Sequence, residues 1–246
     1  MPVTRTSTGF WFAEIARANT RGRMEISSST AMGDGYRSRH LTRMGIERIM
    51  RFAFEAAQKR PKKLLTVVTK SNSMRNGMVL WDEVALSVSK DYPDVIWDKM
   101  LVDGKFEFHY LRRYVNYNEL VMTVRMVNNL TSLDTIVGTN LYMDILSNLT
   151  AALAGSIGVA PSSNLDPTRK KPSLFEPVHC SAFDITGKGV ANPVATSWSA
   201  AEMLEWLGEA EASRKLMTCV ENVCEPGILT PDLQGTASTQ DVVKAV

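Results

Sequence analysis

The pattern of apolar and polar residues becomes regular from Met44 onward. Apolar residues recur at helical spacing from Met44 until Pro61 ends the pattern, which predicts a helix. The apolar run Leu64–Val68 then predicts a buried strand that ends before Lys70. Further elements alternate along the chain, with helices over 78–90 and 142–153 and strands over 95–102 and 133–139. This alternation predicts an α/β fold in which helices cover a largely parallel sheet.

The pattern is weaker on both sides of this region. Residues 1–43 show no regular periodicity, and residues 155–192 are rich in glycine and proline, which predicts a long loop segment. A loop of this length in a compact domain is usually functional. Helices are predicted after it, over 193–207 and 209–224.

Composition limits the class of protein. The 246 residues are 44% hydrophobic and 22% charged with a net charge of +2, which is typical of a soluble domain and favours neither nucleic acid nor a membrane as a partner. No apolar run is long enough to span a membrane. The 3 cysteines form no disulfide framework, which favours a reducing compartment, the cytoplasm. Several arginines near the N-terminus are compatible with a mitochondrial leader, which is the less favoured alternative.

Charged residues follow the predicted strands at the edge where such sheets bind ligands. Lys70 and Asp103 each come after a strand, and Asp144 lies near the start of a helix that follows another strand. A lysine and two carboxylates can hold a hard divalent cation and a proton acceptor, and such a cation can polarise a hydroxyl or carbonyl oxygen. Solvated charges at strand ends produce the same pattern, so residue spacing alone leaves both interpretations open.

A second candidate site is the loop from Glu176 to Pro193. It offers small residues and backbone donors for a phosphate, and Asp184 for a ribose diol. An ordinary surface loop has the same composition. The chain contains neither a G-x-G-x-x-G nor a Walker sequence, so general nucleotide-binding motifs do not decide between the two.

Four ordered stretches resemble the β-decarboxylating dehydrogenases, the family of isopropylmalate, isocitrate, homoisocitrate and tartrate/D-malate dehydrogenases. These stretches are Thr69–Asn72, Asn140–Ser147, Gly155–Pro161 and Glu176–Pro193. Trp81–Glu83 and Trp97–Lys99 resemble the tartrate/D-malate branch in particular. The similarity extends from about Thr42 to the C-terminus with one interruption. It implies the α/β/α sandwich fold of isopropylmalate dehydrogenase.

The resemblance implies an oxidoreductase that uses NAD and Mg²⁺ or Mn²⁺ to oxidise a 2-hydroxy acid such as tartrate or D-malate, with or without decarboxylation. It implies catalytic roles for Lys70 and Asp103, with Lys70 handling the proton of the substrate hydroxyl. It also implies that the metal is bound by Asp103, Asp144 and Asn148. In the family, the partner subunit of a homodimer supplies the lysine and the first aspartate. Five loop residues are implied to line NAD: His179, Ser181, Ala182, Asp184 and Asn192. The aspartate among them would lie on the adenosine ribose and repel the 2′-phosphate of NADP, which favours NAD.

The chain also departs from the family pattern. Roughly the first third of the family fold, with the arginines that hold the substrate carboxylate, has no counterpart, so we expect a sandwich that lacks the N-terminal part of the cofactor domain. Asn148 replaces an aspartate and should weaken metal binding. Cys180 replaces a glycine, and its side chain is expected either to crowd the dinucleotide or to forbid the backbone angles that the loop needs. Leu41 aligns with the family's catalytic tyrosine.

Residues 104–121 interrupt the family pattern with a basic stretch that contains several aromatic residues. A retained intron is the favoured interpretation, because Gly104-Lys105 can be encoded by a splice-donor-like sequence. A surface that stacks nucleic-acid bases is the alternative. Residues 31–41 can be back-translated in a shifted frame into a family-like segment, which makes a frameshift within the N-terminal segment a further hypothesis.

We expect the chain to have three parts. Residues 1–43 form a poorly patterned segment, residues 44–160 a central dimerisation and metal-site domain, and residues 161–246 the C-terminal part of the NAD-binding domain. An incomplete sheet exposes apolar surface and an unpaired edge, so we expect marginal stability. The rival hypothesis is a catalytically impaired fragment that acts at most as a dimerisation module.

Overall fold

The structure is a computed structural model of the chain. It describes residues 24–27, 34–37, 41–103 and 121–246. These residues form two compact units that divide between Met143 and Asp144, whereas the sequence predicts the domain boundary at residue 160. The insertion predicted over 104–121 lies outside the described residues except for Val121, and so does most of the N-terminal segment.

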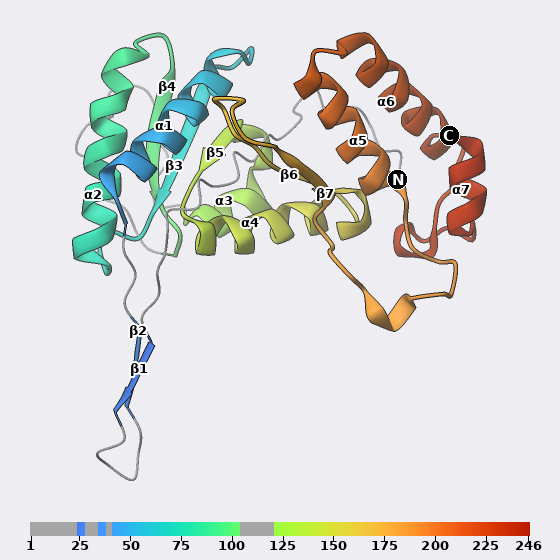
Figure 1. Cartoon of the computed structure of the whole chain (residues 1–246), viewed down its shortest axis with the longest axis horizontal. Helices are drawn as coiled ribbons and strands as arrows, with labels where there is room; N and C mark the ends of the chain where they lie inside the picture. The colour runs from blue at the N-terminus through green and yellow to red at the C-terminus, as the bar shows by residue number, and fades with distance from the viewer. Residues whose placement is uncertain (1–23, 28–33, 38–40, 104–120) are drawn as a thin grey trace. The chain divides into compact units, whose positions relative to one another are not determined.

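A three-stranded parallel sheet forms the centre of the first unit (Figure 1). Its strands, in spatial order, are β4 (Ile96–Leu101), β3 (Leu64–Thr69) and β5 (Thr135–Val137). Leu65 on β3 lies opposite Trp97 on one side and Thr135 on the other, and both pairings are parallel. The interior of β3 is buried, which explains why its sequence is a nearly continuous apolar run. The expected α/β class is therefore confirmed.

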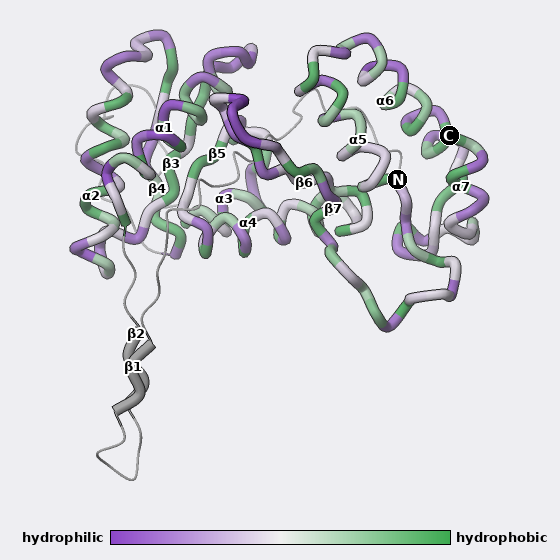
Figure 2. Tube along the Cα trace, viewed as in Figure 1, coloured by the Kyte–Doolittle hydropathy of each residue, from purple (hydrophilic) through white to green (hydrophobic). Residues whose placement is uncertain are grey.

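Helix α1 (Arg43–Gln58) packs its apolar face against this sheet. Thr42 caps the helix, because its side-chain oxygen accepts a hydrogen bond from the Gly45 backbone N–H at 3.2 Å. Ile46, Met50 and other residues at helical spacing are buried on the inner face. The colours along α1 change between hydrophobic and hydrophilic because one face of the helix is apolar and the other polar (Figure 2).

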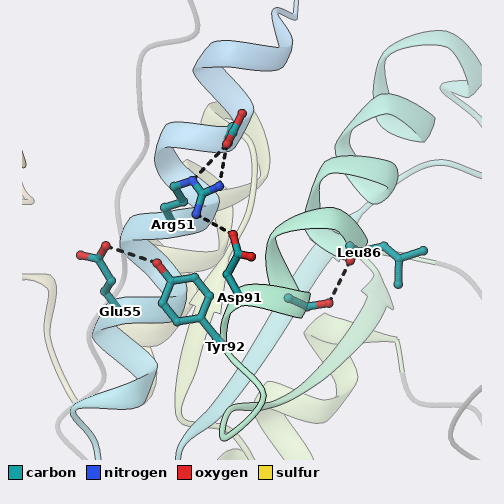
Figure 3. A network of polar contacts seen from close by, with 7 residues as sticks. Arg51, Glu55, Leu86, Asp91 and Tyr92 are labelled. Atoms are coloured by element: carbon teal, nitrogen blue, oxygen red, sulfur yellow. Dashed lines mark hydrogen bonds and ion pairs between the residues drawn. The ribbon is translucent and has the colours of Figure 1, made fainter.

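Polar contacts tie the turn after α2 (Arg75–Val88) to α1 (Figure 3). The Arg51 guanidinium on α1 donates to the Asp91 carboxylate at 2.9 Å. The Tyr92 hydroxyl donates to the Glu55 carboxylate at 3.3 Å. These contacts join α1 to the segment that leads from α2 to β4.

The two segments that resemble the tartrate/D-malate branch supply ion pairs inside this unit. Asp82 on α2 accepts from the Lys99 ammonium on β4 at 2.8 Å. Asp98 on β4 accepts from the Arg125 guanidinium on α3 (Met122–Asn128) at 2.7 Å. Each pair joins a helix to a strand, so the charged residues of both segments support the fold.

The second unit is a helical layer on a short antiparallel ribbon (Figure 1). Its elements in chain order are the larger part of α4 (Asn140–Leu153), β6 (Pro161–Asn164), β7 (Leu174–Pro177), α5 (Val194–Leu207), α6 (Ala210–Cys224) and α7 (Thr239–Ala245). A two-stranded ribbon buries little surface. The core of the unit therefore consists mainly of helix residues, including Val194, Val220, Val223 and Val242.

Several elements were not foreseen from the sequence. The ribbon of β6 and β7 lies inside the stretch predicted as a long loop, because Pro-Ser-Ser-Asn in β6 has no apolar alternation. A second antiparallel ribbon, β1 (Met24–Ser27) with β2 (Asp34–Arg37), lies in the segment that shows no pattern. Among the helices of the described residues, none is both long and apolar enough to cross a membrane.

Candidate active site

Lys70 and Asp103 meet where two neighbouring strands end. Lys70 directly follows β3, and Asp103 comes shortly after β4, whose last residue Leu101 lies opposite Thr69. A backbone hydrogen bond of 3.1 Å from Val102 to Thr69 extends the pairing beyond the sheet. The Lys70 ammonium forms an ion pair with the Asp103 carboxylate. The sequence expectation that these two side chains share the carboxyl edge of the sheet therefore agrees with the geometry.

The two members of this pair differ in exposure. The Lys70 side chain is 19% exposed, whereas the Asp103 side chain is 58% exposed. The backbone carbonyl of Lys70 accepts hydrogen bonds from Ser73 and Met74, which turns the chain sharply into α2. The lysine is thus held by the fold, and its partner carboxylate remains accessible to a further ligand such as a cation.

Asp144 and Asn148 are one turn apart on α4, so they project from the same face of the helix. Both residues are exposed. The Asn148 side-chain amide donates a hydrogen bond to the backbone carbonyl of Asp144 at 2.9 Å. An aspartate has no donor for this contact, so the bond depends on the amide of the asparagine. Its oxygen stays available as a neutral ligand.

The described residues contain no cluster of acidic, histidine or cysteine side chains typical of a metal site. In this part of the chain, no three acidic, histidine or cysteine side chains lie close enough together to hold a metal ion. Asp103 belongs to the first unit and Asp144 to the second. Oxygen donors of the right kind for Mg²⁺ or Mn²⁺ are present, but each supplies only part of a coordination shell.

The loop after β7 presents most of the residues expected to line NAD. Ser181, Ala182 and Asp184 are exposed, and His179 is half-buried with its ring Nδ1 at 3.0 Å from the Cys180 carbonyl oxygen. The Asp184 carboxylate forms no hydrogen bond with other described residues, so both of its oxygens are open to a ribose diol. These features fit the adenosine half of a dinucleotide.

Backbone conformation at the start of this loop depends on a residue other than glycine. Cys180 has a φ of +54°, in the left-handed region that favours glycine. The turn thus forms with a side chain at position 180, so the backbone angles are strained rather than forbidden. Gly187 and Gly189, further along the loop, also have positive φ, and a Cβ added to either would meet no atom within 4 Å.

Asn192 has a different environment from the other loop residues. It is buried, its side-chain oxygen accepts from the Val194 backbone N–H at 2.9 Å, and its amide donates to Asp232 at 2.9 Å. The side chain thus anchors the end of the loop to the start of α5 and to Asp232. Sequence reasoning missed Asp232, because the residue lies in a short 3-10 helix, Pro231–Leu233, 40 positions further along the chain.

The chain belongs to the isocitrate/isopropylmalate dehydrogenase family, whose model matches residues 3–246. This match confirms the resemblance seen in the four motifs. It begins well before Thr42 and so includes the N-terminal segment that the motifs left outside.

Curated relatives place the chain in the tartrate/D-malate branch. It is 62% identical over 244 residues to a probable tartrate dehydrogenase/decarboxylase, TtuC′, of Agrobacterium vitis, which covers 99% of this chain and 61% of the relative. It is 42% identical over 210 residues to the decarboxylating D-malate dehydrogenase of Escherichia coli K12, which covers 83% of this chain and 54% of the relative. The chain therefore spans at most about three fifths of the length of these two proteins.

A solved structure supports the same fold. The isocitrate dehydrogenase from Methylococcus capsulatus superposes with a TM-score of 0.77 at 32% identity, over 91% of this chain and 61% of that protein. The fold class expected from the sequence is thus confirmed by an experimental structure of the family as well as by the parallel sheet described above.

Proposed function

We propose that the chain acts in the NAD- and divalent-metal-dependent oxidation of a 2-hydroxy acid such as D-malate or tartrate. The ion pair between Lys70 and Asp103 carries this proposal, because it puts a proton-handling amine beside an accessible carboxylate at the carboxyl edge of the sheet. The printed names of the relatives, which are tartrate and D-malate dehydrogenases, support the substrate class.

In this proposal, Lys70 accepts the proton of the substrate hydroxyl while a hydride leaves carbon 2 for NAD. The product is a 2-oxo acid. Where a carboxylate lies β to the new carbonyl, as it does after oxidation of D-malate, loss of carbon dioxide follows. Asp103, Asp144 and the neutral oxygen of Asn148 would hold Mg²⁺ or Mn²⁺, which when bound supplies Lewis-acid stabilisation of negative charge on the substrate oxygen.

The site is proposed to be shared between the two subunits of a homodimer. The resemblance to the family, in which the partner subunit supplies the lysine and the first aspartate, supports this arrangement. Lys70 and Asp103 of one subunit would then act with Asp144 of the partner subunit. The exposed Asp184 carboxylate supports NAD rather than NADP as the electron acceptor, since a 2′-phosphate would meet a like charge.

The test is NADH formation by the purified chain with Mn²⁺, NAD and D-malate or L-tartrate. Turnover should disappear with EDTA, and Lys70→Ala should lower kcat by a factor of about 10²–10⁴, the usual contribution of a general base. Lys90→Ala removes an exposed lysine of the same unit and should leave kcat unchanged. Turnover that survives Lys70→Ala would refute the assigned role, and absence of turnover in a folded sample would refute independent activity.

A second candidate function, a module that docks on another protein of the family, is favoured by helix α5. This helix is apolar on most sides, yet Met203 and Leu207 are 39% and 63% exposed. A helix with this composition is normally covered on all sides. Co-elution with the full-length Agrobacterium vitis relative, in a sample that makes no NADH alone, would support docking over catalysis.

A further inference from the structure

A cluster of hydrogen bonds converges on Asp232 in the second unit. Its carboxylate accepts from the Asn192 side-chain amide at 2.9 Å, from the Thr230 hydroxyl at 2.5 Å and from the Ser156 hydroxyl. These donors come from three segments that are far apart in the sequence: the turn after α4, the end of the loop before α5, and the segment after α6. Asn192 and Ser156 are each 8% exposed, and Thr230 is 1% exposed.

The cluster favours the ionised form of the acid. Burial by itself would raise the pKa of Asp232, but the hydrogen bonds from Ser156, Thr230 and Asn192 outweigh this effect and lower the pKa below its usual value. The carboxylate is therefore charged at neutral pH. Its charge strengthens each of these bonds relative to a bond between neutral groups.

The packing around the cluster leaves little room for rearrangement. Gly158 lies directly against it, and a Cβ at this position would come within 2.8 Å of both the Asn192 Cβ and the Asp232 carboxylate. The Gly158 backbone N–H donates to the Ser156 hydroxyl at 2.9 Å. Loss of the carboxylate would thus leave donors without partners in a closely packed site.

A second set of contacts holds the same end of the loop from helix α7. The Thr239 backbone N–H donates to the Gly189 carbonyl at 2.8 Å, and its hydroxyl donates to the Ala191 carbonyl at 2.5 Å. Ser238 and Asp241 form a capping box that fixes the start of this helix. Residues 189–192 are thus held on one side by Asp232 and on the other by Thr239.

We propose that Asp232 is a positioning residue for the dinucleotide loop. Its carboxylate orients Asn192, whose other side-chain atom is bound to the first residue of α5, and so fixes the main chain of residues 189–192 in the conformation that receives the cofactor. This inference rests on the proposed function, in which the loop binds NAD. Asp232 itself does not touch the cofactor in this account.

The experiment compares Asp232→Asn and Asp232→Ala with the wild-type chain and with Glu225→Gln, a control at an exposed acid of the same unit. NAD affinity is measured by calorimetry well below the unfolding temperature of each variant, and amide exchange is followed in a peptide that spans residues 186–194. Both Asp232 variants should raise the Kd for NAD about tenfold and speed exchange in this peptide, because bonds to a charged acceptor are lost. The control should change neither quantity.

Coupling to Asn192 distinguishes positioning from general stabilisation. If Asp232 acts through Asn192, adding Asp232→Ala to Asn192→Ala should weaken NAD binding no further. Should Asp232→Ala fail to fold, Ser156→Ala removes one donor and leaves the carboxylate, and it should raise the Kd about threefold with the same local increase in exchange.

Two results would overturn the proposal. One is that the Asp232 variants unfold at a lower temperature but have the wild-type NAD affinity and the wild-type amide exchange rates over residues 186–194. The other is full additivity between the Asp232 and Asn192 substitutions. If the wild-type chain binds no NAD, the proposed function fails, and the exchange rates still decide whether Asp232 holds the loop.

Discussion

Lys70 and Asp103 form an ion pair although 33 positions separate them in the sequence. The parallel pairing of β3 with β4 brings them together, since Thr69 and Leu101 lie opposite each other at the ends of the two strands. The sheet therefore sets the geometry of the pair, and the exposed Asp103 carboxylate leaves an oxygen accessible to the cation of the proposed metal-dependent oxidation.

A mixing experiment tests whether the site is shared. Lys70→Ala and Asp144→Asn should each be inactive, because each disables both sites of a homodimer. When the two variants are mixed and allowed to exchange subunits, half of the dimers are hybrid and contain one intact site, so activity should recover to about a quarter of the wild-type value. No recovery in a sample with proven subunit exchange would place Lys70 and Asp144 in the same subunit's site.

Asn148→Asp should tighten metal binding. The change adds a negative charge beside Asp144 and removes the amide that binds the Asp144 carbonyl. We expect Mn²⁺ to bind about tenfold more tightly, which corresponds to about 1.4 kcal/mol. Asn128→Asp, at an exposed position, controls for the added net charge. Equal Mn²⁺ affinities of the two variants, measured by calorimetry, would show that residue 148 is not near the metal.

Cys180 should be a site of stored strain. Glycine adopts a φ of +54° without the steric cost that a Cβ incurs, so Cys180→Gly should raise the free energy of unfolding by about 0.5–1 kcal/mol. Cys180→Ala keeps the Cβ and should leave stability unchanged. Urea denaturation of the three proteins measures both effects. A glycine variant no more stable than the alanine variant would mean that the turn relaxes in solution.

Glu202 should make stability depend on pH. Burial, with a smaller effect from the neighbouring Glu205, raises the pKa of Glu202 to about 7. The folded chain then binds this proton more tightly than the unfolded chain does, so the contribution is complete at pH values below about 4.5 and is lost as the pH rises through 7.

Glu202→Gln removes that dependence. At pH 8 the variant should be more stable than the wild type by at most about 3 kcal/mol, and the difference should vanish toward pH 4.5. Glu221→Gln, at an exposed acid of α6, should follow the wild-type curve. Parallel stability curves for Glu202→Gln and the wild type between pH 4.5 and 8 would contradict the raised pKa.

The sequence predicts the regular elements well where apolar residues have a clear period. The helix that ends before Pro61, the buried run from Leu64 and the two helices near the C-terminus correspond closely to α1, β3, α5 and α6. The ribbon β6–β7 was missed because its strands are short and rich in proline and serine, so their pairing depends on tertiary context.

The candidate site was predictable in part. Strand order places Lys70 and Asp103 together once the parallel sheet is inferred, and family motifs identify the loop around Asp184. Asp232 gave no such signal. It lies in a short 3-10 helix, and its contacts come from three donors that only folding brings together. The burial of Asn192 and its bonds to Asp232 and Val194 could not be predicted from the sequence either, since a motif identifies a residue without indicating what its side chain contacts.

The proposed function depends on hydride transfer from carbon 2 of a hydroxy acid to NAD. The most direct test incubates the chain with Mn²⁺, NAD and D-malate deuterated at carbon 2, and determines the mass of the reduced cofactor. We expect one deuterium in each NADH formed, and no reduced cofactor with EDTA. Reduced cofactor without deuterium, or none at all from a folded wild-type sample that binds NAD and Mn²⁺, would contradict it.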